Sequence, residues 1–150
     1  MGKRSTVKGY WRQRGSGAES KATPAPVLSH LAVTFDGAAA NTTLTGKWLP
    51  AGAIITHVDI VSGHTGGTTP AFDIGVNTAT PDPDAILNGA TSTTTGRYLV
   101  GDAASGVLVG TALAADAEIT AGDDGTGTAG TGNITAIITF GFNDDGVVND

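Results

Sequence analysis

Short segments of alternating apolar and polar residues follow one another between residue 27 and residue 142. Each segment is rich in Val, Ile, Thr or Phe and is bounded by Gly, Pro, Asn or Asp, which is typical of β-strands separated by turns. Alternation with a period of two turns one side of each strand toward a core and the other toward water. The segments that we predict to be strands are residues 27–36, 42–49, 53–62, 71–76, 97–101, 106–113, 117–121 and 133–142.

Two of these segments show the alternation most clearly. In residues 53–62, the side chains predicted to face the core are Ile54, Thr56, Val58 and Ile60, and those predicted to face water are Ile55, His57, Asp59 and Val61. In residues 133–142, one face carries Ile134, Ala136, Ile138 and Phe140. A strand with one apolar face must bury that face against a second layer, so the pattern predicts an all-β fold, a β-sandwich of jelly-roll type.

Helix is predicted to be a minor component. Only residues 82–90 fit a helical turn, with Asp82 as the N-cap and Pro83 at the first helical position. Residues 49–52 predict a turn with its proline in the second position. The glycine-rich residues 122–132 predict a flexible loop before the final strand.

Charge divides the chain into two parts. Residues 1–26 contain six basic residues and one acidic residue, a net charge of +5. Residues 27–150 contain two basic and 13 acidic residues, a net charge of −11. Because residues 1–26 also lack apolar periodicity and are interrupted by glycine and proline, we predict a flexible basic N-terminal arm ahead of a β-sandwich body formed by residues 27–150.

The arm has the composition of a docking segment. Tyr10 and Trp11 interrupt its basic run and provide an apolar anchor for a partner's pocket. The alternative, a tail that contributes only solubility, stays open at this stage. The basic residues predicted to give charge complementarity with an acidic partner are Lys3, Arg4, Lys8, Arg12 and Arg14.

Composition excludes several kinds of function. The chain contains no cysteine, so it has no disulfide, thiolate metal cluster or thiol nucleophile. It has no run of about 20 apolar residues and no apolar segment after the basic N-terminus, so neither membrane insertion nor secretory export is predicted. The spacing of Gly125, Gly127 and Gly130 matches a dinucleotide-binding loop, but a β-branched strand follows where that motif needs a helix.

No catalytic or metal-binding pattern stands out. His57, Asp59 and His64 lie close in sequence, but a solvated strand face explains the first two without a metal. The acidic pairs 123–124 and 144–145 fit no calcium-binding motif. Since the chain also lacks a nucleophile elbow, we predict a protein that is not an enzyme and uses no cofactor.

The body resembles small virion proteins of tailed bacteriophages, of the cement, decoration or head-fibre kind. The resemblance covers roughly residues 45–142 and is one of texture and order rather than of an invariant signature. The segments that carry it are LPAGAIITHVDIV (residues 49–61), FDIGVNTATPDPDAILNGA (residues 72–90), RYLVGD (residues 97–102) and TAIITFGF (residues 135–142).

The resemblance implies a location and a role. It implies a β-sandwich that binds the outer capsid surface as a homodimer or homotrimer and reinforces the capsid against the pressure of the packaged DNA. The main partner would be the major capsid protein, and the arm, residues 1–26, would reach neighbouring capsid subunits. Assembly would take place in the host cytoplasm, and the mature location would be the virion surface.

Two other functions remain possible from the sequence. A head fibre that binds a receptor or a glycan would use the loops at residues 63–70 and 122–132, although neither contains an aromatic residue on which a sugar stacks. An internal protein that packages nucleic acid would use the basic arm. The −11 charge of the body argues against nucleic acid, because it repels the same phosphates.

Overall fold

Eight β-strands make up the described part of the chain, in a computed structural model that describes residues 28–68 and 70–142. There is no helix among these residues, which confirms the all-β prediction. Seven of the eight predicted strands coincide with observed ones. The strands are β1 (Ser29–Asp36), β2 (Leu44–Leu49), β3 (Ala53–Ser62), β4 (Ala71–Asn77), β5 (Asp82–Thr91), β6 (Gly96–Leu99), β7 (Ala117–Asp123) and β8 (Asn133–Phe142).

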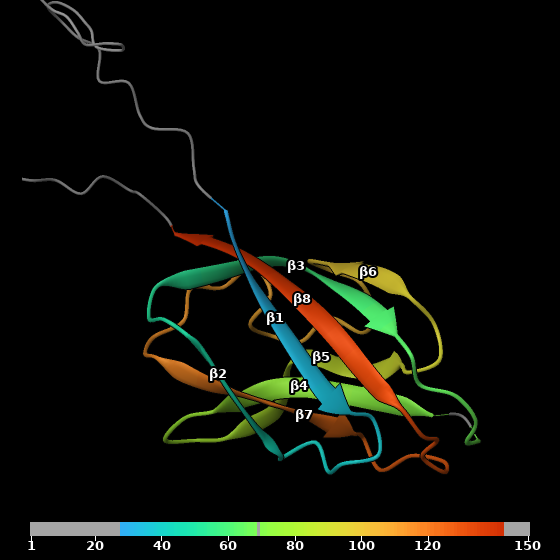
Figure 1. The fold of residues 1–150 in the computed structure, drawn as a ribbon. Helices are drawn as coiled ribbons and strands as arrows, with labels where there is room; N and C mark the ends of the chain where they lie inside the picture. Colours follow the sequence, from blue (N-terminus) through green and yellow to red (C-terminus); the bar gives the residue numbers. More distant parts are fainter. Residues whose placement is uncertain (1–27, 69, 143–150) are drawn as a thin grey trace, which may run out of the picture.

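The strands form two four-stranded antiparallel sheets with the orders β1-β8-β3-β6 and β2-β7-β4-β5 (Figure 1). The first strand pairs with the last, β2 with β7, β3 with β6, and β4 with β5. The chain is thus folded back on itself like one long hairpin whose successive pairs alternate between the two sheets. This is the jelly-roll arrangement of a β-sandwich, as predicted.

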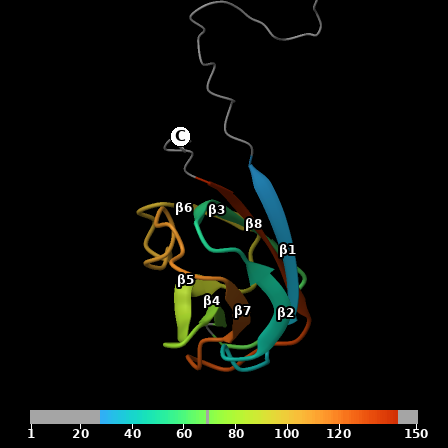
Figure 2. The same cartoon turned by 90° about the vertical axis from the view of Figure 1, so that its left-hand side faces the viewer.

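The core lies between the two sheets, which Figure 2 shows as one layer above the other. On β8, the residues predicted to share a face are all buried there: Ile134, Ala136, Ile138 and Phe140. The rings of Phe35 on β1 and Phe72 on β4 meet across the core with their centroids 5.6 Å apart. Apolar side chains of both inner faces therefore interlock, as in other aligned sandwiches.

The alternation predicted for β3 is wrong at its beginning. Ile55 is fully buried and Ile54 is only half-buried, the reverse of the prediction, whereas Val58 and Ile60 face the core as expected. The cause is a register shift between Ile55 and His57 in the pairing with β8. Such a bulge adds one residue to the strand, so two successive side chains face outward before the alternation resumes.

Residues 82–90 are not a helical turn but most of β5, an edge strand that pairs with β4. Ala85, Ile86 and Leu87 are buried in succession, because register shifts against β4 interrupt the regular alternation. Pro83 is tolerated because a strand at the edge of a sheet needs fewer backbone donors. A short apolar run of this kind cannot be assigned to helix or strand by periodicity alone.

The predicted strand at residues 106–113 is also wrong. This segment is a series of turns that covers the open side of the sandwich. Leu108 N donates to Ala85 O of β5 at 2.8 Å, and Leu113 N donates to Ala53 O of β3 at 2.9 Å. Its hydrogen bonds are thus divided between two sheets, so it cannot continue a ladder with either one. It covers the edge of β5 and the first residues of β3, which lie beyond the pairing of β3 with β6.

The turn between β2 and β3 lies one residue later than predicted. Ala53 N donates to Pro50 O at 3.1 Å, which places the proline first in the turn rather than second. Gly52 occupies the third position with φ of 83°. Glycine adopts this left-handed conformation without the steric cost that a side chain would add.

The carboxyl group of Asp73 is buried on the side of β4 that faces away from the core. Its Oδ2 accepts a hydrogen bond from Asn41 Nδ2 at 2.6 Å, and its Oδ1 accepts one from Gly89 N at 2.8 Å. Burial raises the pKa of Asp73, and these two hydrogen bonds only partly oppose the effect. Asp73 therefore joins β4, β5 and the β1–β2 connection at the cost of burying a charge.

Exchanging the two partners, Asp73→Asn with Asn41→Asp, is expected to reduce the pH dependence of stability. Because the folded-state pKa of Asp73 is raised, its contribution is complete below about pH 4 and is lost as the pH rises through the raised value. The exchange keeps both hydrogen bonds and moves the charge to a more exposed position. Urea unfolding at pH 4 and pH 7 measures the difference.

Asp73→Ala is the comparison variant for this exchange. It leaves two donors unpaired and should lower the free energy of unfolding by about 1–3 kcal/mol for each. If the exchanged protein loses as much stability between pH 4 and pH 7 as the unmodified protein does, the buried charge of Asp73 is not the cause of that loss.

Candidate functional site

The seven residues predicted to dock on a partner lie outside the described residues. They are Lys3, Arg4, Lys8, Tyr10, Trp11, Arg12 and Arg14. The predicted boundary between arm and body, after residue 26, also lies outside them. What the structure does give is the place on the body to which the N-terminal segment is attached.

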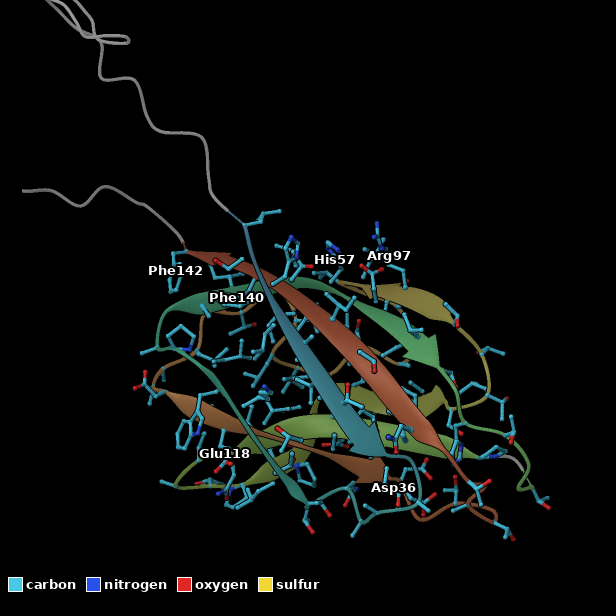
Figure 3. All side chains as sticks on the ribbon, viewed as in Figure 1. Asp36, His57, Arg97, Glu118, Phe140 and Phe142 are labelled. Atoms are coloured by element: carbon cyan, nitrogen blue, oxygen red, sulfur yellow. The ribbon has the colours of Figure 1, made fainter. Side chains whose placement is uncertain are left out.

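The described chain begins and ends side by side at one end of the sandwich (Figures 1 and 3). β1 and β8 are antiparallel neighbours, with Ser29 opposite Phe140. Leu28 and Phe142 are both about half exposed, at 48% and 49%. The Phe142 ring meets Phe140 edge-on at 6.0 Å, so it extends the apolar core to the surface. We call this end of the sandwich the chain-end surface.

A cavity of about 350 Å³ opens at the same end of the sandwich. Its walls come from the end of β4, the start of β5, the start of β7 and the loop that covers the open side. The strand pairing fixes its position, because Leu49 lies opposite Ala117 and Ala53 lies opposite Phe142. The cavity and the first and last described residues therefore share the chain-end surface.

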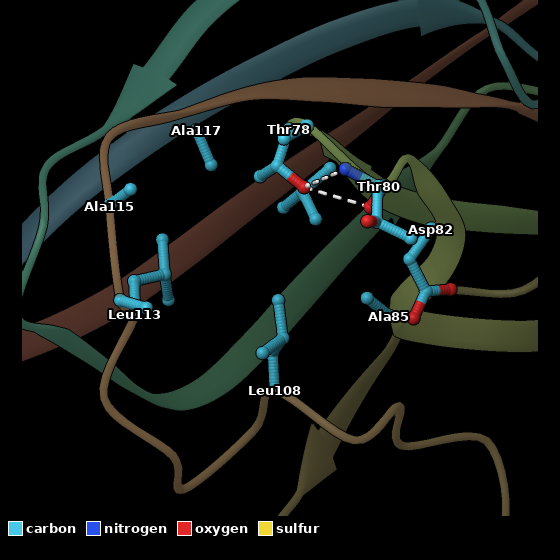
Figure 4. Close-up of a pocket in the computed structure, with 11 residues that line it drawn as sticks. Thr78, Thr80, Asp82, Ala85, Leu108, Leu113, Ala115 and Ala117 are labelled. Atoms are coloured by element: carbon cyan, nitrogen blue, oxygen red, sulfur yellow. Dashed lines mark hydrogen bonds between the residues drawn. The ribbon is translucent and has the colours of Figure 1, made fainter.

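The cavity has an apolar floor and a polar rim. The buried floor consists of Val76, Ala85, Leu113 and Ala117. Figure 4 shows Ala115 on one side of the cavity and Asp82 on the other. On the rim, the Thr78 hydroxyl donates to Thr80 O at 2.8 Å. An apolar group fits this floor, and a polar or charged group beside it can reach the rim.

A pair of carboxyl groups lies beside the cavity: Asp82 lines it, and Asp84 is hydrogen-bonded to Asp82. A hydrogen bond with Asp84 is the main cause that raises the pKa of Asp82, and burial and the negative charge of Asp84 add to it. Asp84 also accepts a hydrogen bond from Asn88 Nδ2 at 2.6 Å. Negative charge is thus concentrated beside an apolar cavity, an arrangement that favours an apolar group with a cationic neighbour.

A second cluster of polar side chains crosses the outer face of the β1-β8-β3-β6 sheet. Arg97 on β6 donates two hydrogen bonds to Asp59 on β3, at 2.5 and 2.9 Å, and these hold the pKa of Asp59 below its usual range. Figure 3 shows Arg97 beside His57 on this face. The members of the cluster are His30, Thr56, His57, Asp59, Arg97 and Thr139.

Part of this cluster resembles a catalytic relay in composition but not in bonding. Thr56 Oγ1 lies 3.1 Å from His57 Nδ1, and His57 Nε2 lies 3.5 Å from Asp59 Oδ2. The Thr56 hydroxyl, however, donates to the Thr139 carbonyl at 3.2 Å, so its oxygen can only accept from His57. Activation of a nucleophile needs the opposite direction, with the hydroxyl donating to the histidine.

The structure does not bring His64 to His57 and Asp59. His64 is buried, at 2% exposure, and its Nδ1 lies 2.8 Å from Ser92 Oγ. Among the described residues, no group of three His, Cys, Asp or Glu side chains is placed to hold a metal ion. Of the two acidic pairs, residues 144–145 lie outside the described residues. No helix in the described part of the chain is long and apolar enough to cross a membrane.

The two loops considered for receptor or glycan binding pair with each other. Thr65 and Thr131 exchange two backbone hydrogen bonds of 2.9 Å, and Thr68 and Thr128 do the same. Gly130 packs so closely that a Cβ there would lie 2.2 Å from Thr65 O. The loop predicted to be flexible is therefore tied to its neighbour over part of its length, at the end of the sandwich opposite the chain-end surface.

One solved structure is similar to this chain. It is a chain of the capsid asymmetric unit of cyanophage Pam1, with 12% sequence identity over 91% of this chain and 99% of that chain, at a TM-score of 0.50. The two chains share a fold. At this identity the likeness is one of architecture. No family model and no curated protein sequence matches the chain.

The cavity and the pairing of Asp59 with Arg97 are not predicted from the sequence. The cavity is built from residues 76–85 and 108–117, and the alternation in the second segment predicts a strand over part of its length. The alanines at positions 114, 115 and 117 are the feature of the sequence that could have indicated a cavity, because small side chains leave room at a surface. Arg97 is one of only two basic residues after residue 26, among 13 acidic ones. This excess of acidic residues indicates that Arg97 pairs with a carboxylate.

Proposed function

We propose that this chain is a structural protein of a phage virion, which binds the outer surface of the capsid and stabilises it. The observation that carries the proposal is the shared fold with a chain of the cyanophage Pam1 capsid asymmetric unit. The resemblance of the body to phage cement and decoration proteins, found independently in the sequence, supports the same role.

The chain-end surface provides a physical basis for attachment. The described chain begins and ends there, so the +5 segment, residues 1–26, is joined to the body next to the exposed side chains of Leu28 and Phe142. In this proposal the arm binds an acidic groove of the major capsid protein. Its basic residues steer the encounter, and Tyr10 and Trp11 anchor the complex.

In this proposal the protein is not an enzyme. It acts by binding alone, and a homodimer or homotrimer of it would hold several capsid subunits together. Two contacts support this part of the proposal. The Thr56 hydroxyl donates to a backbone carbonyl and not to His57, and Asp59 is paired with Arg97, so both side chains make structural contacts.

Binding of the purified full-length chain to capsids of its own virus tests the proposal. We expect the chain to sediment with the capsids at low salt and to raise the temperature at which they open. Cryo-electron microscopy should show the sandwich outside the shell with its chain-end surface toward the capsid. Density inside the shell, or at the tail alone, would overturn the proposal.

A further inference from the structure

The apolar cavity and the attachment point of the arm occupy the same end of the sandwich. The cavity lies between residues 76–85 and 108–117, and the described chain begins at Leu28 next to Phe142. Contact between an apolar floor and water is unfavourable. An apolar group that covers the floor removes this contact and is therefore stabilised there. The cavity therefore calls for an occupant at this end.

The arm contains apolar and positively charged side chains that are complementary to the cavity. An aromatic side chain carries a large apolar surface, and Tyr10 and Trp11 are the only two aromatic residues in residues 1–27. Arg12 follows them directly. The carboxyl group of Asp82 lines the cavity, and that of Asp84 is hydrogen-bonded to it. The aromatic pair of the arm therefore matches the apolar floor, and its neighbouring positive charge matches the carboxyl groups beside that floor.

The length of the arm allows this contact within one molecule. Position 28 is 17 residues after position 11, and at about 3.3 Å per residue this length of chain spans up to about 55 Å. The longest strands have ten residues and are about 33 Å long. A tethered segment is also present at an effective concentration in roughly the millimolar range, well above that of other copies in dilute solution.

We propose that, in the isolated protein, Tyr10 and Trp11 occupy the cavity of their own chain, with Arg12 beside Asp82 and Asp84. The arm is then stored on the body and must leave the cavity before it can bind another surface. This contact needs no capsid, so its failure would leave the proposed function unaffected.

Tryptophan fluorescence of the full-length chain tests the contact. The chain has two tryptophans, and Trp48→Phe leaves Trp11 as the only one. In this variant we expect emission at short wavelength and protection from quenching by acrylamide. Adding Ala115→Phe fills the cavity and should lower the ratio of docked to undocked chains about tenfold or more, which exposes Trp11.

Two further variants complete the experiment. Ala79→Phe fills the cavity from the opposite wall and should have the same effect as Ala115→Phe, so the test does not depend on one substitution folding correctly. Ala38→Phe is the matched control, because Ala38 is an exposed alanine near the other end of the sandwich, and it should leave Trp11 protected. Circular dichroism checks that each variant is folded.

Two results would overturn the proposal. The first is equal quenching of Trp11 in the folded cavity-filled variants and in the control. The second is protection of Trp11 that disappears on dilution, because this would assign the cavity to the arm of another copy. Protection that is independent of protein concentration and is lost in both filled variants is the supporting result.

Discussion

A chain that lacks residues 1–21 is expected to keep its fold and to lose capsid binding. The buried core residues in the described part of the chain lie between Val33 and Phe140, so the deletion removes none of these. It does remove all six basic residues of the arm and both of its aromatic residues. Since two aromatic anchors at an interface each contribute about 2 kcal/mol or more, affinity should fall about 1,000-fold. Co-sedimentation with capsids measures this loss.

Two full-length variants separate the contributions within the arm. Replacing Tyr10 and Trp11 with alanine should mainly speed dissociation, because it removes the anchors and keeps the charge. Replacing the basic residues with glutamine should slow association and make binding less sensitive to salt. Unchanged binding by the truncated chain would show that the arm does not dock, even if the body binds the capsid by another surface.

Gly75→Ala is expected to lower the free energy of unfolding by about 3 kcal/mol or more. Gly75 lies in β4, and a Cβ at this position would lie 2.1 Å from Asp82 O and 2.2 Å from Pro83 C of β5. Both contacts are with backbone atoms, which cannot rotate away as a side chain can. The two strands must therefore separate, and the pairing between them is strained or lost.

Gly96→Ala is the matched control for this substitution. Gly96 also lies in a strand, but no atom of the described residues comes within 4 Å of a Cβ placed there. Its effect should stay within about 0.5 kcal/mol. Urea unfolding of the three proteins gives the comparison, and similar midpoints for the two variants would show that the β4–β5 contact can relax.

Alternation along single strands was enough to predict most of the fold. Residues 133–142 show why, because four apolar side chains at every second position fill the inner face of β8 without a break. The errors occur where a neighbouring strand determines the result. The bulge at Ile55 depends on the register with β8, and the strand at residues 82–91 depends on its pairing with β4. Neither partner can be read from the local sequence.

The candidate site also has one part that the sequence predicts and one part that it does not. The charge of the arm and its Tyr10–Trp11 pair are plain in the sequence, because they depend on composition alone. The cavity brings together two segments separated by more than 20 residues, and it exists because residues 106–113 form turns between the sheets. Sequence periodicity carries no information on such a meeting of distant segments.

The central place of β8 has a consequence for how the protein reaches its native state. β8 lies between β1 and β3, and its pairing with β1 joins residues as far apart as Ser29 and Phe140. Closing so long a loop is slow, and topologies dominated by distant contacts fold in milliseconds to seconds. Until the ribosome has released residues 133–142, one sheet lacks one of its two inner strands. The sandwich must then form after synthesis of its last strand, while the basic N-terminal segment has already left the ribosome.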